Sequence, residues 1–102
     1  MDLITRTILG YTAEVVGVNP DHIATPCRKR ELIIARAIFA DIAYTKYRYT
    51  YAQIGRILNR DHSSVIHAVR TLANDCEQRP ELKHLHRQVF NKTADYLQRL
   101  EG

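Results

Sequence analysis

The sequence of 102 residues has no tryptophan, one methionine and only two cysteines. Two cysteines do not indicate the disulfide scaffold of a secreted protein, so we expect a reducing, cytoplasmic location. The longest apolar stretch, residues 32–43, is interrupted by Arg36 and Asp41 and is too short to span a bilayer. Asp2 and Arg6 interrupt the N-terminus, so we recognise no signal peptide. We therefore expect no membrane partner.

Residue patterns that carry catalysis or hold a metal are also missing. The sequence has no Cys-x-x-Cys and no Gly-rich phosphate loop. Neither His62 with His67 nor His84 with His86 has the i, i+4 spacing of helical zinc sites. Ser63 adjoins His62, but neighbours along a helix rarely converge as a catalytic triad does. We therefore expect no enzyme, no metal and no cofactor.

The composition, with 45% apolar and 25% charged residues, is that of an ordinary globular protein. We expect a single domain over residues 1–102, which can bury roughly 60–68% of the surface of the extended chain. Residues 28–70 hold nine Lys or Arg against three Asp or Glu, whereas residues 1–27 have a balance of −2 and residues 71–102 are neutral. A basic middle indicates a polyanion site, and a solvated basic face is the alternative interpretation.

Apolar residues recur at helical spacing, which predicts an all-α, compact multi-helix domain. A first helix is expected over residues 3–16, with Gly17 at its end. Asn19-Pro20 then offers an N-cap and a first helical residue for a single turn that buries Ile23. The segment 31–47 is apolar nearly all round, which is typical of a central helix covered by the others.

A last helix is expected after Pro80. Its apolar positions fall on one face: Leu82, Leu85, Val89, Tyr96 and Leu100. We interpret this helix as a buttress that closes the domain, and a dimerisation helix is the weaker alternative.

Residues 50–76 have the pattern of a helix-turn-helix. Thr50-x-x-Gln53 predicts a capping box at the start of its first helix. Only Asn59 and Arg60 separate that helix from a second one, for which Asp61 is the expected N-cap. Other helical hairpins also have short loops, so connectivity alone does not decide. One side of the second helix is an apolar stripe for the core: Val65, Val69, Leu72 and Cys76.

The other side of this second helix carries short donors and acceptors beside a cation: His62, Ser63, Ser64, His67, Arg70 and Thr71. Such a helix is chemically fit to enter a DNA major groove, where hydroxyls and imidazoles can meet base edges. Tyrosines interleave with cations over residues 44–51, which can indicate base stacking on single strands. In an all-helical domain we favour core edges and phosphate contact for these residues.

The run Arg60-Asp61-His62-Ser63-Ser64-Val65-Ile66-His67-Ala68 resembles the signature of the C-terminal DNA-binding domain (domain IV) of the bacterial replication initiator DnaA. Residues 51–56 are similar to the first helix of that family's helix-turn-helix, and residues 28–30 to its basic loop. The resemblance runs from about Leu3 to the 90s and implies the family's fold and DNA binding. It does not include the nucleotide-binding part of a full initiator.

The resemblance also implies roles for individual residues. The Arg that matches Arg28 reaches the minor groove, and bases are read by the residues that match Asp61, His62 and Ser63. Backbone or nearby base edges are held by the residues that match Ser64, His67, Arg36 and Arg60. We expect Arg36 to face the same surface as the basic loop 27–30. The candidate DNA-binding residues are therefore Arg28, Lys29, Arg30, Arg36, Arg60, Asp61, His62, Ser63, Ser64, His67 and Arg70.

The chain departs from the family pattern in three places. Ile34 and Ala37 stand where the family has an Arg and a Gln that flank the basic site of the central helix. The turn lacks the usual Gly-Gly and has Asn59 in a turn one residue shorter. Tyr44 stands where a Lys is often found.

The resemblance implies sequence-specific binding of double-stranded DNA at a DnaA-box-like site, in replication initiation or its regulation. We expect a monomer, with replication proteins as further partners. The alternative is a protein-interaction module or transcriptional regulator that uses the same face for a protein. Whether the chain is a stand-alone protein or the excised end of an initiator stays open.

Overall fold

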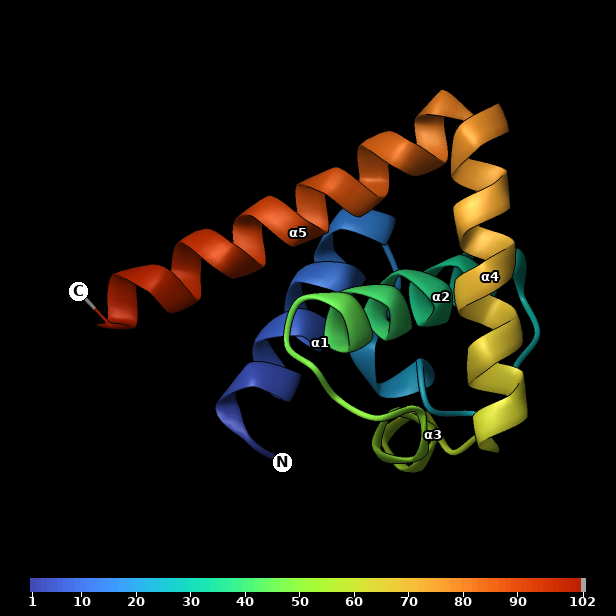
Figure 1. The fold of residues 1–102 in the computed structure, drawn as a ribbon, viewed down its shortest axis with the longest axis horizontal. Helices are drawn as coiled ribbons and strands as arrows, with labels where there is room; N and C mark the ends of the chain where they lie inside the picture. The colour runs from blue at the N-terminus through green and yellow to red at the C-terminus, as the bar shows by residue number, and fades with distance from the viewer. Residues whose placement is uncertain (102) are drawn as a thin grey trace.

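The computed structural model describes residues 1–101, and over that range it is all-α, as predicted. Five α-helices and one 3₁₀ turn follow one another along the chain (Figure 1): α1 Leu3–Val16, η1 Pro20–His22, α2 Arg30–Thr45, α3 Tyr51–Leu58, α4 His62–Gln78 and α5 Pro80–Glu101. Within the described range, no helix combines the length and the apolar character needed to cross a membrane.

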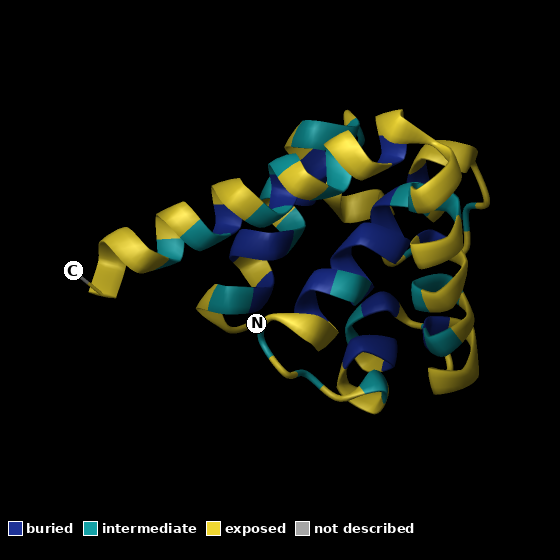
Figure 2. Ribbon diagram, turned by 45° about the horizontal axis from the view of Figure 1, so that its top comes forward, coloured by how far each residue is buried: buried dark blue, intermediate teal, exposed yellow. Residues whose placement is uncertain are grey.

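Helix α2 is the centre of the domain. Ile38, Phe39 and Ile42 have no exposed surface, and α1, α3, α4 and α5 all pack against this helix. In Figure 2 the buried colour runs along most of its length, which confirms the predicted central helix. The helix ends at Thr45, two residues earlier than expected, because Arg48 adopts the left-handed conformation with φ of 61° and turns the chain toward α3.

The first helix has the predicted bounds because both of its ends are capped. Asp2 Oδ1 accepts a hydrogen bond from the backbone N–H of Thr5 at 2.7 Å. Gly17, with φ of 86°, ends the helix in the left-handed conformation that glycine adopts without strain. Asn19 then caps the 3₁₀ turn, and Ile23 is 1% exposed, as the sequence predicted.

Helix α5 closes the domain from its start to about Thr93, which is the last buried residue of the helix. Leu82 and Val89 are buried, whereas Tyr96 is 39% and Leu100 55% exposed, so the predicted apolar face is covered by the domain in the earlier turns and not in the last ones. Figure 1 shows the reason: the C-terminal turns of α5 extend past the helices beneath them. The ring of Tyr96 lies at the edge of this contact, 6.2 Å from the ring centroid of Tyr11 on α1.

Candidate nucleic-acid interface

The first helix of the helix-turn-helix, α3, begins with the predicted capping box. Thr50 Oγ1 accepts from the backbone N–H of Gln53 at 3.0 Å, and Gln53 Oε1 accepts from the backbone N–H of Thr50 at 2.8 Å. These two bonds satisfy backbone donors that a helix start leaves without an intrahelical partner. They fix the residue at which the chain enters the motif.

The turn between α3 and α4 is held by a close backbone crossing. Asn59 takes the left-handed conformation (φ 57°, ψ 47°), which asparagine tolerates better than most residues. The backbone N–H of Arg60 then donates to the carbonyl of Gly55 at 2.8 Å. A Cβ atom on Gly55 would lie 2.5 Å from the carbonyl oxygen of Arg60, so the crossing requires glycine. Sequence reasoning missed Gly55, although a glycine inside a short amphipathic helix is a signal of close approach.

Helix α4 starts as predicted, with Asp61 as its N-cap. Asp61 Oδ1 accepts from the backbone N–H of Ser64 at 2.7 Å, and this bond is the main reason why the pKa of Asp61 is lowered. Val65 is 2% and Leu72 5% exposed, so the predicted inner stripe is confirmed at these positions. The other two members of the stripe, Val69 and Cys76, are half-buried.

The predicted polar face of α4 lies on the outside of the molecule, where every member is exposed: His62, Ser63, Ser64, His67, Arg70 and Thr71. Among the described residues, no internal hydrogen bond involves the side chain of His62 or Ser63. His67 Nε2 and Thr71 Oγ1 lie 3.5 Å apart. The first turn of α4 therefore presents polar groups that are available to a ligand.

The basic loop lies directly before α2. Arg28, Lys29 and Arg30 are all exposed, and Arg30 is already the first residue of the helix. The loop is joined to the helix-turn-helix by a hydrogen bond, because Arg60 Nη2 donates to the carbonyl of Thr25 at 2.8 Å. The three cations are thus tied to the start of α4 through a residue shortly before them in the chain.

The position of the Arg36 side chain differs from the one expected from the sequence. We expected its side chain to face the surface of the basic loop, but it is 7% exposed. Its Nε donates to the carbonyl of Ile23 at 2.6 Å and its Nη2 to that of Thr25 at 2.7 Å. Burial, and secondly the charge of Arg60, lower the pKa of the Arg36 guanidinium. The apolar neighbours of Arg36 on α2 direct this position inward, and the carbonyls of the preceding loop receive its donors.

Arg60 is also directed at backbone carbonyls. Besides its bond to Thr25, its Nη1 donates to the carbonyls of Leu58 at 3.2 Å and Asn59 at 3.1 Å. These bonds close the turn of the motif from outside. The sequence resemblance gave Arg60 a place at the DNA, whereas the structure engages its guanidinium with the protein backbone.

The tyrosines of residues 44–51 mostly lie at the edge of the core. Tyr49 Oη donates to Asp2 Oδ1 at 2.8 Å and accepts from Thr5 Oγ1 at 3.1 Å. The rings of Tyr44 and Tyr51 stack at 4.1 Å between centroids with 6° between planes. Tyr44 is 40% exposed, and one face of its ring is covered by this stack.

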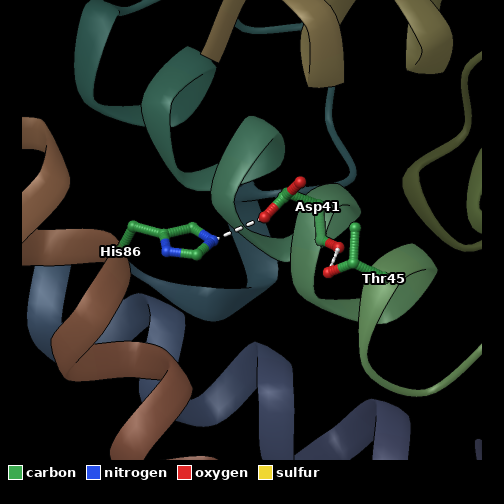
Figure 3. A network of polar contacts seen from close by, with 3 residues as sticks. All are labelled: Asp41, Thr45 and His86. Atoms are coloured by element: carbon green, nitrogen blue, oxygen red, sulfur yellow. Dashed lines mark hydrogen bonds and ion pairs between the residues drawn. The ribbon is translucent and has the colours of Figure 1, made fainter. Parts of the chain in front are cut away.

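A second polar cluster lies near the C-terminal half of α4, at a cavity of about 510 Å³ between α2, α4 and α5. His86 Nε2 lies 2.6 Å from Asp41 Oδ2, and the carbonyl of Asp41 accepts from Thr45 Oγ1 at 2.7 Å (Figure 3). Cys76 lines the same cavity, where burial raises the pKa of its thiol. Residues 1–101 contain no group of three His, Cys, Asp or Glu side chains placed to hold a metal ion.

A capped short helix, a tight turn and a second helix with an exposed polar first turn, beside a basic loop, define a helix-turn-helix domain. Residues 5–72 match the family described as bacterial DnaA protein helix-turn-helix. The chain belongs to this family, and membership supports DNA binding. The recognition from the sequence is thereby confirmed.

Three relatives illustrate the similarity. The chromosomal replication initiator protein DnaA 1 of Chlamydia trachomatis is 30% identical over 71 residues, which are 70% of this chain and 16% of the relative. The DnaA protein of Bacteroides fragilis is 38% identical over 71 residues, 69% of this chain and 15% of the relative. That of Mycoplasma pneumoniae is 34% identical over 69 residues, 68% of this chain and 16% of the relative. The matched region is therefore a small part of each relative's length.

Proposed function

We propose that this chain binds double-stranded DNA sequence-specifically, with α4 in the major groove and the basic loop at the adjacent minor groove. The observation that carries the proposal is the exposed first turn of α4, where His62 and Ser63 have no internal partner and the loop with Arg28 is tied alongside. Major-groove edges offer a distinct pattern of donors and acceptors for each base pair, which such side chains can read.

The proposed contacts divide into reading and holding. His62 and Ser63 read base edges, and the carboxylate oxygen of Asp61 that does not cap α4 can accept from a cytosine amino group. Arg28 enters the minor groove, where a cation is attracted most strongly over A·T-rich sequence. Phosphates are held by exposed residues around these readers: Lys29, Arg30, Ser64, His67 and Arg70. Neither Arg36 nor Arg60 is needed as a phosphate contact.

The biological setting of the proposal is replication initiation or its regulation, at a site like a DnaA box. Its support is the name of the relatives, which are chromosomal replication initiators. This chain matches about 16% of such a protein, so only the DNA-binding step is transferred. We propose that the chain binds its site as a monomer.

The test is selection of bound duplexes from a random pool, followed by titration of the selected and a scrambled duplex at several salt concentrations. We expect the selected duplex to bind about 10³-fold or more tightly than the scrambled one. The logarithm of both binding constants should fall linearly with the logarithm of salt concentration, because phosphate contacts release counterions. Equal affinity for the two duplexes would contradict sequence reading, and binding insensitive to salt would favour the protein-interaction alternative.

A further inference from the structure

The carbonyl oxygen of Thr25 is shared by two arginines, one on the central helix and one in the turn of the helix-turn-helix. Arg36 Nη2 on α2 donates to it at 2.7 Å, and Arg60 Nη2, in the turn before α4, donates to it at 2.8 Å. Arg36 is further fixed by the bond from its Nε to the carbonyl of Ile23. One backbone atom thus joins the central helix, the loop and the helix-turn-helix.

This joint lies between the two proposed reading elements. Thr25 precedes Arg28 by three residues, and Arg60 directly precedes the capping residue Asp61. Between Thr25 and Arg28 stand Pro26, whose ring fixes its φ angle and restricts the residue before it, and the half-buried Cys27. A short and stiff segment therefore transmits the position of Thr25 to Arg28.

The joint is electrostatically unusual because two guanidinium groups meet at one acceptor. Among the described residues, no carboxylate forms an ion pair with Arg36 or Arg60. Both guanidinium groups donate to backbone carbonyls, whose dipoles leave both positive charges available to attract a polyanion at longer range. Coulomb repulsion between the two groups opposes this arrangement, so its hydrogen bonds must hold it.

We propose that Arg60 is a positioning residue that holds the basic loop in register with the recognition helix, through the Thr25 carbonyl that it shares with Arg36. The inference rests on the proposed DNA binding. The role differs from that of a phosphate contact, because Arg60 acts through Arg28. Loss of Arg60 thereby removes the energetic benefit of Arg28 at the minor groove, while α4 still reads its bases.

The experiment is a double-mutant cycle of Arg60→Lys and Arg28→Ala on the selected duplex. Lysine keeps the charge but lacks the planar fork that reaches three carbonyls. We expect Arg28→Ala to lower affinity about tenfold in the wild-type background and less than about twofold in the Arg60→Lys background. Preference for an A·T over a G·C flank should disappear in Arg60→Lys, and its salt slope should flatten by roughly 0.9, as in Arg28→Ala, because a displaced Arg28 no longer releases its counterion. The matched control is Arg56→Lys, an exposed arginine on α3 whose variant should leave the cycle additive.

A second experiment uses the free protein without DNA, so it tests the positioning role of Arg60 even if the proposed function is wrong. In the free protein, backbone ¹⁵N relaxation should give order parameters near 0.85 for residues 27–29 in the wild type and below about 0.6 in Arg60→Lys. The same change should occur in Arg60→Gln and be absent in Arg56→Lys. Unchanged order parameters would overturn the positioning role whether or not the chain binds DNA. An equal tenfold loss from Arg28→Ala in both backgrounds would overturn it for DNA binding.

Discussion

His62 and His86 differ in their exposure and in whether the protein supplies them with a hydrogen-bond partner. His62, on the first turn of α4, is exposed and has no internal partner, whereas His86 lies 2.6 Å from Asp41 at the cavity between α2, α4 and α5. A polar side chain satisfied inside the protein contributes to stability, while an exposed and unsatisfied one can serve a ligand. A histidine that has a partner within the protein therefore serves the structure, whereas an exposed histidine without one can serve recognition.

The two regions also differ in the charges that they present. The first region, which we call the reading face, is the first turn of α4 with the adjoining loop, whose three consecutive cations form no ion pair within residues 1–101: Arg28, Lys29 and Arg30. The cavity is lined by charges of both signs: Lys83, Arg87, Asp41 and Glu77. A mixed lining has little net attraction for a polyanion, whereas the reading face attracts one at a distance.

The largest expected effect breaks both regions at once, because they share α4. Val65→Asp places an unpaired carboxylate at a position that is 2% exposed. We expect a loss of unfolding free energy of at least about 3 kcal/mol, measured by urea denaturation followed by circular dichroism. Asn74→Asp, at an exposed position of the same helix, should change stability by no more than about 0.5 kcal/mol. Equal effects of the two variants would contradict the assignment of the faces of α4.

Replacing each histidine by alanine separates the two regions. His62→Ala should weaken binding to the selected duplex by about 1–3 kcal/mol and relax sequence preference, with little change in stability. His86→Ala should leave affinity unchanged and lower stability by about 0.5–1.5 kcal/mol, because Asp41 loses its partner. Duplex titration and urea denaturation of both variants check these two expectations. A loss of affinity in His86→Ala, or a loss of stability alone in His62→Ala, would contradict the assignment of recognition to one region and structure to the other.

The charge difference is tested by two arginines. Arg28→Ala should flatten the slope of log K against log salt by roughly 0.9, because one counterion fewer is released. Its affinity loss should be greatest on duplexes with A·T-rich flanks. Arg87→Ala, at the cavity, should leave the slope unchanged in the same titrations. A uniform loss on every duplex would reduce Arg28 to a phosphate contact.

The smallest expected effect concerns the pH dependence of the cap of α4. Folding lowers the pKa of Asp61 below its ordinary value of 3.8, so its stabilising contribution is present above that value and is lost as the pH falls through the folded pKa. Asp61→Asn keeps a capping oxygen but does not titrate. We expect its stability to fall less steeply than that of the wild type below about pH 4, in denaturation series at stepped pH. Asp2, whose pKa is also lowered, keeps part of the acid dependence in both proteins.

The sequence predicted the fold well because its local signals agreed with one another. Asp2, Gly17, Thr50 and Asp61 cap their helices as their residue types suggest. Apolar periodicity identified the central helix, but it could not give the length of the surface under α5. Tyr96 and Leu100 continue the pattern of the buried turns and are exposed because α5 extends past its neighbours. A helical period specifies a face, and the partner of that face is a tertiary fact.

The candidate site was predicted less completely. Exposure of the polar first turn of α4 followed from its pattern, since a helix with one apolar side turns the other outward. The directions of Arg36 and Arg60 could not be predicted, because the acceptor that they share is the backbone carbonyl of Thr25, 11 and 35 residues away in sequence. Every residue has a backbone carbonyl, so the sequence does not indicate which carbonyl will accept a bond from a given arginine. The close crossing at Gly55 likewise depends on where Arg60 lies.

The stacked pair of Tyr44 and Tyr51 gives the domain a built-in optical probe. The rings lie 4.1 Å apart and nearly parallel, one at the end of α2 and the other at the start of α3, and the chain has no tryptophan to mask them. Electronic transitions of rings held in this way couple, so the pair should contribute a near-ultraviolet circular dichroism signal that vanishes when α3 leaves α2. Comparison with a Tyr44→Phe variant isolates this signal. Docking of the helix-turn-helix onto the core can therefore be followed spectroscopically without an added label.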